Sequence, residues 1–336
     1  ESYMAIKVLH IGLGPIGAGV VRQVATRKGF KIVGAVDIDP AKVGKDLGEI
    51  CGVGRKLRIK VTSDIAKAIK ATKPDVAVLC TNSSLKAVVG QFEAVLKLRV
   101  PIVSTTEELA YPVKSNAAAA RKIDRLAKKA KVAVLGTGVN PGFVMDALPI
   151  ALTGVCESVT GIEIDRVQDA RVRRLPFQQK IGAGLTRAQF MARVKAGTVR
   201  HVGLAESITM IADAFGWKLD KVTDIIKPKM TTEAVTSEFM TVEPGLVCGL
   251  IQDGIGYQKG KAIITLHMEA YLGAPESFDA VRIKGNPALT MKIAGGVHGD
   301  VATASITVNS IPKVMSAAPG LRTMRDMVLP SYFGGK

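Results

Sequence analysis

The chain has 336 residues, of which 47% are hydrophobic and 22% charged, values typical of a globular protein. This length exceeds most single hydrophobic cores, so we expect two domains. No apolar run approaches the roughly 20 residues of a membrane-spanning helix. The N-terminus also lacks the basic flank and apolar core of a secretory signal, so we expect no membrane partner.

The 46 basic and 29 acidic residues give the chain a net charge of +17. Such a charge would suit nucleic acid, or an anionic cofactor or substrate. Nucleic-acid surfaces usually cluster basic side chains and add aromatic ones for stacking. Aromatic residues make up only 4% here, and the lysines are spread along helical stretches. Spread charge favours solvated helix faces, so we expect no nucleic-acid partner.

The cysteines and histidines are scattered along the chain. Without C-x-x-C spacing, and in apolar surroundings, the cysteines indicate buried thiols of a cytoplasmic protein. The dispersed histidines do not predict a zinc site, so we expect no metal. The cysteines are Cys51, Cys80, Cys156 and Cys248.

Apolar runs alternate with helical stretches through residue 155. The apolar runs cover residues 5–14, 30–37, 74–81, 100–105 and 131–138, and the helical stretches cover 15–29, 85–99 and 112–130. This alternation predicts an α/β fold with a Rossmann-type, doubly wound parallel sheet. We therefore assign residues 1–155 to a nucleotide-binding domain.

The pattern changes over residues 156–299. Polar and apolar residues alternate from Ser158 onward, which is typical of a strand exposed on one face. Helical stretches follow at 185–197 and 204–216, and several strands at 235–294. We predict a second α+β domain with a mixed sheet, used for substrate binding and for formation of a homodimer. The C-terminal helix, 300–336, is expected to pack back on the first domain.

A glycine-rich loop follows the first apolar run. The segment HIGLGPIGAGV contains Gly12-x-Gly14-x-x-Gly17, with Pro15 and Ile16 at the opening of a helix. Glycines permit the tight turn and the close approach of a pyrophosphate, which then lies at the helix N-terminus. Strand, loop and helix come in the right order, so we predict binding of NAD or NADP.

The choice between these cofactors stays open. Asp37 ends the second strand 20 residues after Gly17, where a carboxylate binds a ribose hydroxyl and repels a 2′-phosphate. Lys42 and Lys45 follow and could receive that phosphate. The polar residues that end the next strand are expected to line the nicotinamide side, or else to form a turn before a helix. They are Thr81, Asn82 and Ser83.

Two adjacent carboxylates, Glu107 and Glu108, follow the apolar run at 100–105. They could occupy a first helical turn after Thr106 as N-cap, where the helix dipole favours acids. Their position at the carboxyl edge of a parallel sheet, where such folds bind ligands, also allows a role in chemistry.

Five segments resemble a known group of enzymes. They are GLGPIGAGV, AVDIDPAKVGKDLGE, STTEELAYP, GTGVNPGFVMD and RRLPFQQKIGAG. Together they resemble the 2,4-diaminopentanoate dehydrogenases and related NAD(P)-dependent amine dehydrogenases, which share their nucleotide-binding domain type with dihydrodipicolinate reductase. The resemblance covers the chain to about residue 205. It implies reversible oxidative deamination of a small primary amine to a ketone or aldehyde plus ammonia.

The resemblance also implies roles for individual residues. Glu108 is expected to be the acid/base residue, with Glu107 as the alternative. Asn140, Pro141 and Gly142 would lie beside the nicotinamide. The residues expected to shape the substrate pocket are Met145, Phe177, His201 and His267, although lone histidines are more often structural.

The chemistry of a carboxylate agrees with this role. The cofactor carries out the hydride transfer, so the protein has to handle protons and charge. A carboxylate near the nicotinamide can deprotonate the ammonium substrate, favour a cationic iminium and activate water. Partial burial would raise its pKa toward neutrality.

Other readings remain. A basic cluster at 166–180 would grip the carboxylate of 2,4-diaminopentanoate, or else forms a solvated strand edge or a dimer contact. Dihydrodipicolinate reductase itself uses a paired His-His, which this chain lacks. A phosphorylating aldehyde dehydrogenase would need a nucleophilic Cys at a helix start, whereas Cys156 is expected at a helix end. A non-catalytic NAD(P)-sensing protein is the alternative outside enzymes.

Overall fold

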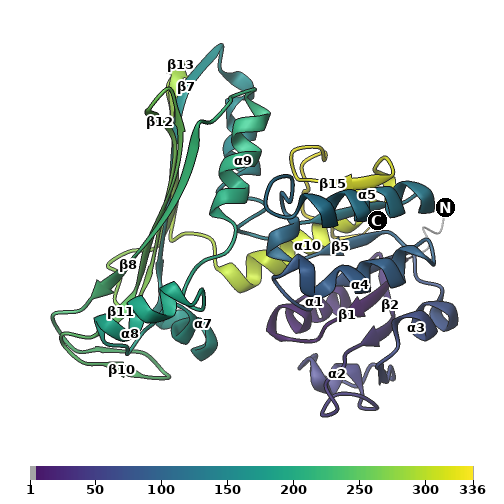
Figure 1. Cartoon of the computed structure of the whole chain (residues 1–336). Helices are drawn as coiled ribbons and strands as arrows, with labels where there is room; N and C mark the ends of the chain where they lie inside the picture. The colour runs from purple at the N-terminus through teal and green to yellow at the C-terminus, as the bar shows by residue number, and fades with distance from the viewer. Residues whose placement is uncertain (1–4, 336) are drawn as a thin grey trace. The chain divides into compact units, whose positions relative to one another are not determined.

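The computed structural model describes residues 5–335, which form two compact units (Figure 1). One unit runs to Phe143 and resumes at His298, and the other is Val144–Val297. The sequence placed the first boundary at 155. It lies earlier because helix α6 (Ala147–Leu152) packs against α9 (Leu204–Ala214), and Asp146 accepts a 2.8 Å hydrogen bond from Ser207.

The first unit contains a seven-stranded parallel sheet with the strand order β15-β6-β5-β4-β1-β2-β3. The strands are β1 (Ile6–Ile11), β2 (Phe30–Val36), β3 (Val61–Thr62), β4 (Val76–Leu79), β5 (Ile102–Ser104), β6 (Ala133–Gly136) and β15 (Gly320–Arg322). The direction of winding reverses between β1 and β4, so the predicted doubly wound fold is confirmed.

Helices connect these strands. They are α1 (Pro15–Thr26), α2 (Leu47–Ile50), α3 (Ile65–Thr72), α4 (Leu85–Leu96), the 3₁₀ turn η1 (Glu107–Leu109), α5 (Ala117–Ala130) and α10 (Gly299–Ser316). The central strands are buried on both faces, as their continuous apolar runs predict. Leu79, Phe92 and Ile102 are fully buried in the core between sheet and helices.

The C-terminal segment belongs to the first unit but is not one long helix. Helix α10 packs against α1 and ends at Ser316, after which β15 pairs with β6. The ring of Phe333 then meets that of Phe30 edge to face, with centroids 5.2 Å apart. The helix expected over 300–336 is therefore correct only to residue 316.

The second unit contains a six-stranded mixed sheet in the order β14-β13-β7-β12-β11-β8. Its strands are β7 (Ser158–Asp169), β8 (Lys221–Met230), β11 (Val247–Gln258), β12 (Lys261–Tyr271), β13 (Phe278–Asn286) and β14 (Leu289–Ala294). Only β7 and β12 pair in parallel, and the other pairs are antiparallel. This sheet confirms the predicted α+β character of the second unit.

Short helices and a small ribbon complete this unit. They are η2 (Thr153–Val155), η3 (Ala170–Val172), α7 (Leu175–Lys180), α8 (Arg187–Lys195) and the ribbon of β9 (Val235–Thr236) with β10 (Thr241–Val242). Helix α9 lies on one face of the large sheet, since a Cβ added at Gly254 would meet Ile208 at 2.9 Å. Strand β8 was not predicted, because its side chains are mostly half-buried or exposed and produce no apolar run.

Candidate functional site

The loop between β1 and α1 requires two of its glycines. Gly12 has φ +88°, and a Cβ there would lie 2.5 Å from the carbonyl oxygen of Cys80. A Cβ at Gly17 would lie 2.0 Å from the carbonyl oxygen of Gly12. Both positions therefore require glycine, because any side chain would clash in the tight turn that the loop makes at the carboxyl edge of the sheet.

Gly14 has a different environment. It is the N-cap residue of α1, no heavy atom lies within 4 Å of a Cβ built on it, and no side chain caps the helix. Pro15 occupies the first turn, and its missing N–H costs nothing there. The open space and the uncapped helix N-terminus, which includes Ile16 and Gly17, therefore fit a pyrophosphate.

Asp37 follows β2, and its side chain is hydrogen-bonded both to the glycine loop and to the segment after β2. Its carboxylate accepts hydrogen bonds from Leu13 N (2.8 Å) and Asp39 N (2.9 Å), and Lys42 Nζ lies 3.3 Å away. Burial opposes its charge, but these hydrogen bonds and Lys42 outweigh burial and lower the pKa of Asp37. The carboxylate is therefore ionised at neutral pH, beside the glycine loop.

The segment after β4 forms a turn, as one reading of the sequence predicted. Thr81 donates to Gln91 Oε1 (2.8 Å), and Asn82 Oδ1 accepts from Ser84 N (2.8 Å). The carbonyl oxygen of Ser83 accepts a 3.1 Å hydrogen bond from Glu108 N. The structure thus brings residues 81–83 and Glu108 together at one edge of the sheet.

Glu108 is held by one of its two carboxylate oxygens. Oε2 accepts hydrogen bonds from Leu85 N (2.8 Å) and Asn116 Nδ2 (3.4 Å). Within residues 5–335, Oε1 has no hydrogen-bond partner. The side chain is half-buried, so the carboxylate has a fixed orientation and one oxygen available for a proton.

Glu107 is also half-buried and lies in the same turn, η1. The turn begins after Thr106, but Thr106 makes no side-chain cap and its hydroxyl instead accepts from Ser104 (3.0 Å). The helical-start reading is therefore correct for the backbone and wrong for the cap.

The loop after β6 is buried and tied to α10. Val139 N donates to Thr303 Oγ1 (3.3 Å), and Asn140, Pro141 and Gly142 are all buried. A Cβ at Gly142, where φ is +128°, would lie 2.5 Å from Gly138 N. This loop leaves the sheet at the same carboxyl edge as the glycine loop and η1.

In the second unit, three of the predicted pocket residues are wholly or partly buried. Met145 is fully buried, and Phe177 stacks under the guanidinium of Arg173 at 4.0 Å. His201 is bonded through its backbone to the side chain of Gln252 (2.8 and 3.0 Å). Burial lowers the pKa of His201 to about 3, so its imidazole is neutral.

The structure does not bring His267 together with His201. His267 bonds Asp253 (2.6 Å) and Glu269 (3.0 Å), whereas His201 bonds Gln252, the neighbour of Asp253 on β11. Adjacent strand residues point to opposite faces of a sheet, so the two histidines lie on opposite sides. Sequence spacing alone could not reveal this, because it requires the register of β11 with β12.

Two arginines of the basic cluster at 166–180 form ion pairs. Arg166 is buried, pairs with Asp279 (2.5 Å) and donates to the carbonyl oxygen of Val297 (2.9 Å). Arg171 pairs with Asp169 (2.6 Å). The partner of Arg166 is 113 residues away in sequence, so the pairing gives no local signal.

Other candidate chemistry finds little support in the described part of the chain. Burial raises the pKa of the Cys51 and Cys80 thiols to about 11, which leaves both protonated. No group of three or more His, Cys, Asp or Glu side chains within residues 5–335 is arranged to hold a metal. No helix among these residues is long and apolar enough to cross a membrane.

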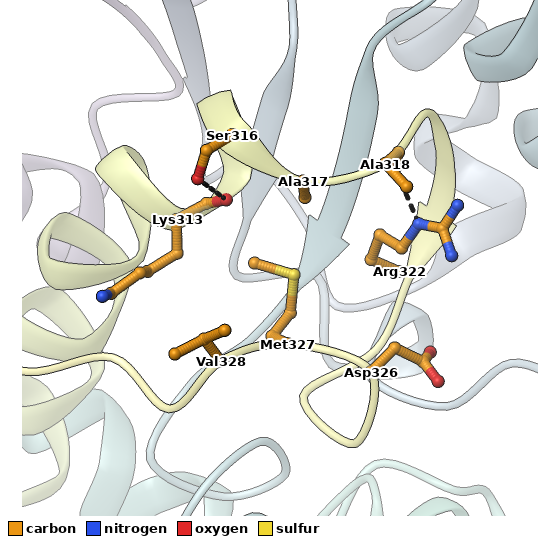
Figure 2. Close-up of a pocket in the computed structure, with 8 residues that line it drawn as sticks. All are labelled: Lys313, Ser316, Ala317, Ala318, Arg322, Asp326, Met327 and Val328. Atoms are coloured by element: carbon orange, nitrogen blue, oxygen red, sulfur yellow. Dashed lines mark hydrogen bonds between the residues drawn. The ribbon is translucent and has the colours of Figure 1, made fainter.

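A cavity of about 230 Å³ lies at the end of α10 (Figure 2). Its lining includes Lys313, Arg322 and Met327, and none of the predicted site residues. The Arg322 guanidinium donates to the carbonyl oxygens of Ala318 (2.8 Å) and Pro319 (2.5 Å). This cavity is separate from the residues at the carboxyl edge.

Comparison with known proteins agrees with this arrangement. Residues 6–137 match the dihydrodipicolinate reductase N-terminus, and residues 143–336 match the 2,4-diaminopentanoate dehydrogenase C-terminal domain. A 2,4-diaminopentanoate dehydrogenase from Acetoanaerobium sticklandii is 34% identical over 98% of this chain and 95% of that protein. The chain belongs to the 2,4-diaminopentanoate dehydrogenase family. The resemblance stated from the sequence is thereby confirmed.

One further protein sequence and two solved structures are similar to this chain over nearly its whole length. An amine dehydrogenase from Streptomyces virginiae is 22% identical over 96% of both chains. The structure of an amine dehydrogenase from Mycobacterium smegmatis shares the fold, with a TM-score of 0.87 and 24% identity over 99% of each chain. A dihydrodipicolinate reductase from Paenisporosarcina shares the fold more loosely, with a TM-score of 0.53 over 97% of this chain.

Proposed function

We propose that this chain is an NAD(P)-dependent amine dehydrogenase, which converts a primary amine and water into a ketone or aldehyde, ammonia and reduced cofactor, and also runs in reverse. The observation that carries the proposal is the Glu108 carboxylate at the carboxyl edge of the nucleotide-binding sheet. One oxygen is held by Leu85 N and the other has no hydrogen-bond partner within residues 5–335. Family membership supports the same function.

The residues of the first unit fit the cofactor. The uncapped N-terminus of α1 at Gly14 would hold the pyrophosphate, and Asp37 would bind a ribose hydroxyl. Residues 81–83 and 140–142 would line the nicotinamide end. When bound, the oxidised cofactor accepts hydride from the amine carbon.

The proton transfers of the reaction are assigned to the carboxylate of Glu108. Glu108 takes a proton from the substrate ammonium, because only a neutral amine can release hydride to form an iminium. Glu108 then releases this proton to solvent, and the regained charge of its carboxylate stabilises the cationic iminium. Glu108 next accepts a proton from the water that attacks the iminium carbon and passes it to the nitrogen. Ammonia then leaves as the new hydroxyl group loses its proton and becomes the carbonyl.

We assign NAD as the preferred cofactor. Asp37 is ionised beside the loop, and a carboxylate there repels a 2′-phosphate. Lys42 is engaged by two carboxylates, at 3.3 Å from Asp37 and 3.5 Å from Asp39. Of the two lysines that could receive the phosphate, Lys42 is therefore already paired with carboxylates.

A carboxylate-bearing diamine such as 2,4-diaminopentanoate is the second candidate substrate. The Acetoanaerobium sticklandii relative favours it. Against it, Arg166 and Arg171 already pair with Asp279 and Asp169, so neither offers a free guanidinium for a substrate carboxylate. This pairing removes two of the five cations of the basic cluster from that role, whereas amines and ketones that lack a carboxylate need none of them. The expected homodimer and cytoplasmic location stay predictions.

The decisive experiment compares Glu108→Gln with Glu107→Gln. Oxidation of 2,4-diaminopentanoate and of carboxylate-free amines is followed with NAD⁺ and NADP⁺, and NADH binding is measured by fluorescence. We expect Glu108→Gln to lower turnover by about 100-fold or more while binding is kept. Full activity in Glu108→Gln with loss in Glu107→Gln would move the role to Glu107. If the wild-type protein binds NADH but converts no amine or ketone, it is a sensor instead.

A further inference from the structure

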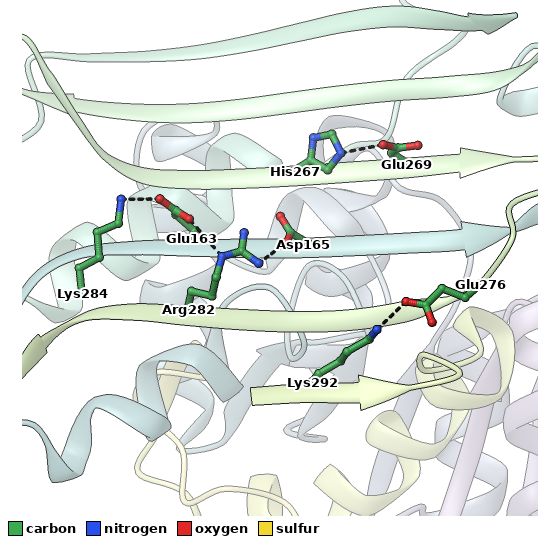
Figure 3. Close-up of polar contacts among 8 residues, drawn as sticks. All are labelled: Glu163, Asp165, His267, Glu269, Glu276, Arg282, Lys284 and Lys292. Carbon is green, nitrogen blue, oxygen red and sulfur yellow. Dashed lines mark hydrogen bonds and ion pairs between the residues drawn. The ribbon is translucent and has the colours of Figure 1, made fainter. Parts of the chain in front are cut away.

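Arg325, in the segment after β15, contacts a neutral group. In the sheet of the second unit, the basic side chains of Arg282, Lys284 and Lys292 each pair with a carboxylate (Figure 3). The guanidinium of Arg325 instead donates a 3.1 Å hydrogen bond to the hydroxyl oxygen of Tyr111. Within residues 5–335, Arg325 forms no ion pair. Its contact therefore fixes a phenol ring and neutralises no charge.

Tyr111 lies two residues after the turn η1, which carries Glu108. It is only 6% exposed, so its large ring is enclosed by close-packed neighbours. The turn itself packs on the end of the parallel sheet, since a Cβ at Gly136 of β6 would lie 2.6 Å from the carbonyl carbon of Leu109. A shift of the Tyr111 ring would therefore move the backbone that carries Glu108.

The loop that follows Tyr111 returns to the same carboxylate. Its middle, residues 113–115, is exposed, whereas Asn116 at the N-cap of α5 is half-buried. The side-chain amide of Asn116 donates to Glu108 Oε2 (3.4 Å). Tyr111 is thus the buried fixed point between two elements that hold Glu108, the turn on one side and Asn116 on the other.

The segment that carries Arg325 is itself fixed. Thr323 donates to Asp326 Oδ2 through its backbone N–H (3.1 Å) and through its hydroxyl (2.8 Å), which closes a turn around Arg325. Thr323 and Met324 are buried, and the strand before them, β15, pairs with β6. An ordered element therefore presents the guanidinium to Tyr111, which lies 214 residues earlier in the chain.

We propose that Arg325 and Tyr111 are positioning residues for Glu108. Their hydrogen bond holds η1 and the loop to Asn116 in place, so that the carboxylate keeps the orientation needed for proton transfer. A displacement of about 1 Å in a reacting group can cost about 100-fold in rate, so a contact outside the chemistry controls turnover. Neither side chain takes part in the proton transfers. The inference rests on the proposed role of Glu108.

The test is a double-mutant cycle of Tyr111→Phe and Arg325→Met in the full chain. Both variants remove the hydrogen bond and keep most of the bulk of the side chain. Oxidation of 2,4-diaminopentanoate and of carboxylate-free amines gives kcat and KM, and fluorescence gives NADH affinity. We expect each variant to lower kcat by about tenfold while KM for the amine and NADH affinity change by less than about twofold.

The double variant should have a kcat within about twofold of either single variant, because both changes remove the same contact. Arg325→Lys keeps a donor and should recover much of the lost kcat. Lys128→Met is the control, since it removes another exposed cation of the first unit from its pair with Asp124 (2.7 Å). We expect it to leave kcat unchanged.

Hydrogen exchange of the amides of residues 107–110 provides a readout that does not require turnover. We expect exchange at least about fivefold faster in Tyr111→Phe and in Arg325→Met. If the wild-type protein converts no amine, the proposed function fails and this exchange alone decides the inference. Unchanged exchange in both variants overturns the inference. So does unchanged kcat in an active protein, an additive loss in the double variant, or an equal loss in Lys128→Met.

Discussion

Glu108 Oε2 accepts a 2.8 Å hydrogen bond from the backbone N–H of Leu85, 23 residues earlier in the chain. Leu85 is the first residue of α4, and the N-cap residue Ser84 makes no side-chain cap. The glutamate therefore takes the place of a capping side chain, and the helix N-terminus fixes the orientation of the carboxylate.

This contact predicts a difference between two substitutions at Glu108. Glutamine keeps an oxygen that can accept from Leu85 N, whereas alanine leaves this N–H without its partner. We expect Glu108→Ala to destabilise the fold by about 0.5–2 kcal/mol, and Glu108→Gln by clearly less. Thermal unfolding followed by circular dichroism measures both. Equal melting temperatures for the two variants would contradict the capping role.

The glycine loop predicts opposite phenotypes at Gly12 and Gly14. Gly12→Ala forces a Cβ to 2.5 Å from the Cys80 carbonyl at φ +88°, so we expect a loss of stability of about 1–3 kcal/mol. Gly14→Val meets open space and should leave the melting temperature nearly unchanged. Its side chain would instead occupy the pyrophosphate position and weaken NADH binding, measured by fluorescence, by about tenfold or more. Unchanged NADH affinity in Gly14→Val would argue against this phosphate position.

The Asp37 carboxylate predicts the cofactor preference. Asp37→Asn keeps an oxygen for Leu13 N but removes the charge, and it releases Lys42 from its closer ion pair. We expect the ratio of NADPH to NADH affinity to rise by about tenfold or more, because one repulsive charge becomes neutral and a cation is freed. Fluorescence titration with both cofactors measures the ratio.

Lys42→Gln in the Asp37→Asn background provides the control for that prediction. If the freed lysine receives the 2′-phosphate, the second substitution should reverse most of the gain. A ratio that stays constant in both variants would show that Asp37 does not contact the ribose.

The His267 network predicts a pH-dependent stability. Burial opposes the protonated imidazole, but hydrogen bonds to Asp253 and Glu269 outweigh burial and raise its pKa above 6.5. The folded state thus binds this proton more tightly than the unfolded state does. The resulting stability is complete below the ordinary value of 6.5 and is lost as pH rises through the higher folded value.

His267→Gln should therefore lower the free energy of unfolding more at about pH 6 than at about pH 9, by a difference on the order of 1 kcal/mol. Thermal unfolding at the two pH values measures this difference. His298→Gln is the control for a histidine without a carboxylate partner among residues 5–335, since His298 is exposed and its Nδ1 accepts only a long N-cap hydrogen bond from Val301 N (3.5 Å). A penalty for His267→Gln that is the same at both pH values would mean that the imidazole is not charged in the fold.

Local patterns were sufficient for much of the first unit. The buried strands β4 and β6 are continuous apolar runs because both of their faces are covered by helices. The glycine spacing located the turn and the open helix N-terminus, because a position where a Cβ would clash with the backbone must be glycine. The short strand β3 and the helix α3 were not predicted, although Asp64 at the N-cap and the buried Ala68 and Ile69 of α3 are a helical signal.

The sequence by itself determined the doubly wound fold, the family, and the position of two glutamates at the edge of a nucleotide-binding sheet. Only the tertiary structure decided that Leu85 and Asn116 hold Glu108, that Lys42 is paired with Asp37, and that His267 faces away from His201. The first set depends on periodicity and backbone sterics, which neighbouring residues encode. The second depends on strand register and on contacts such as that of Arg166 with Asp279, 113 residues apart, which only the folded chain brings together.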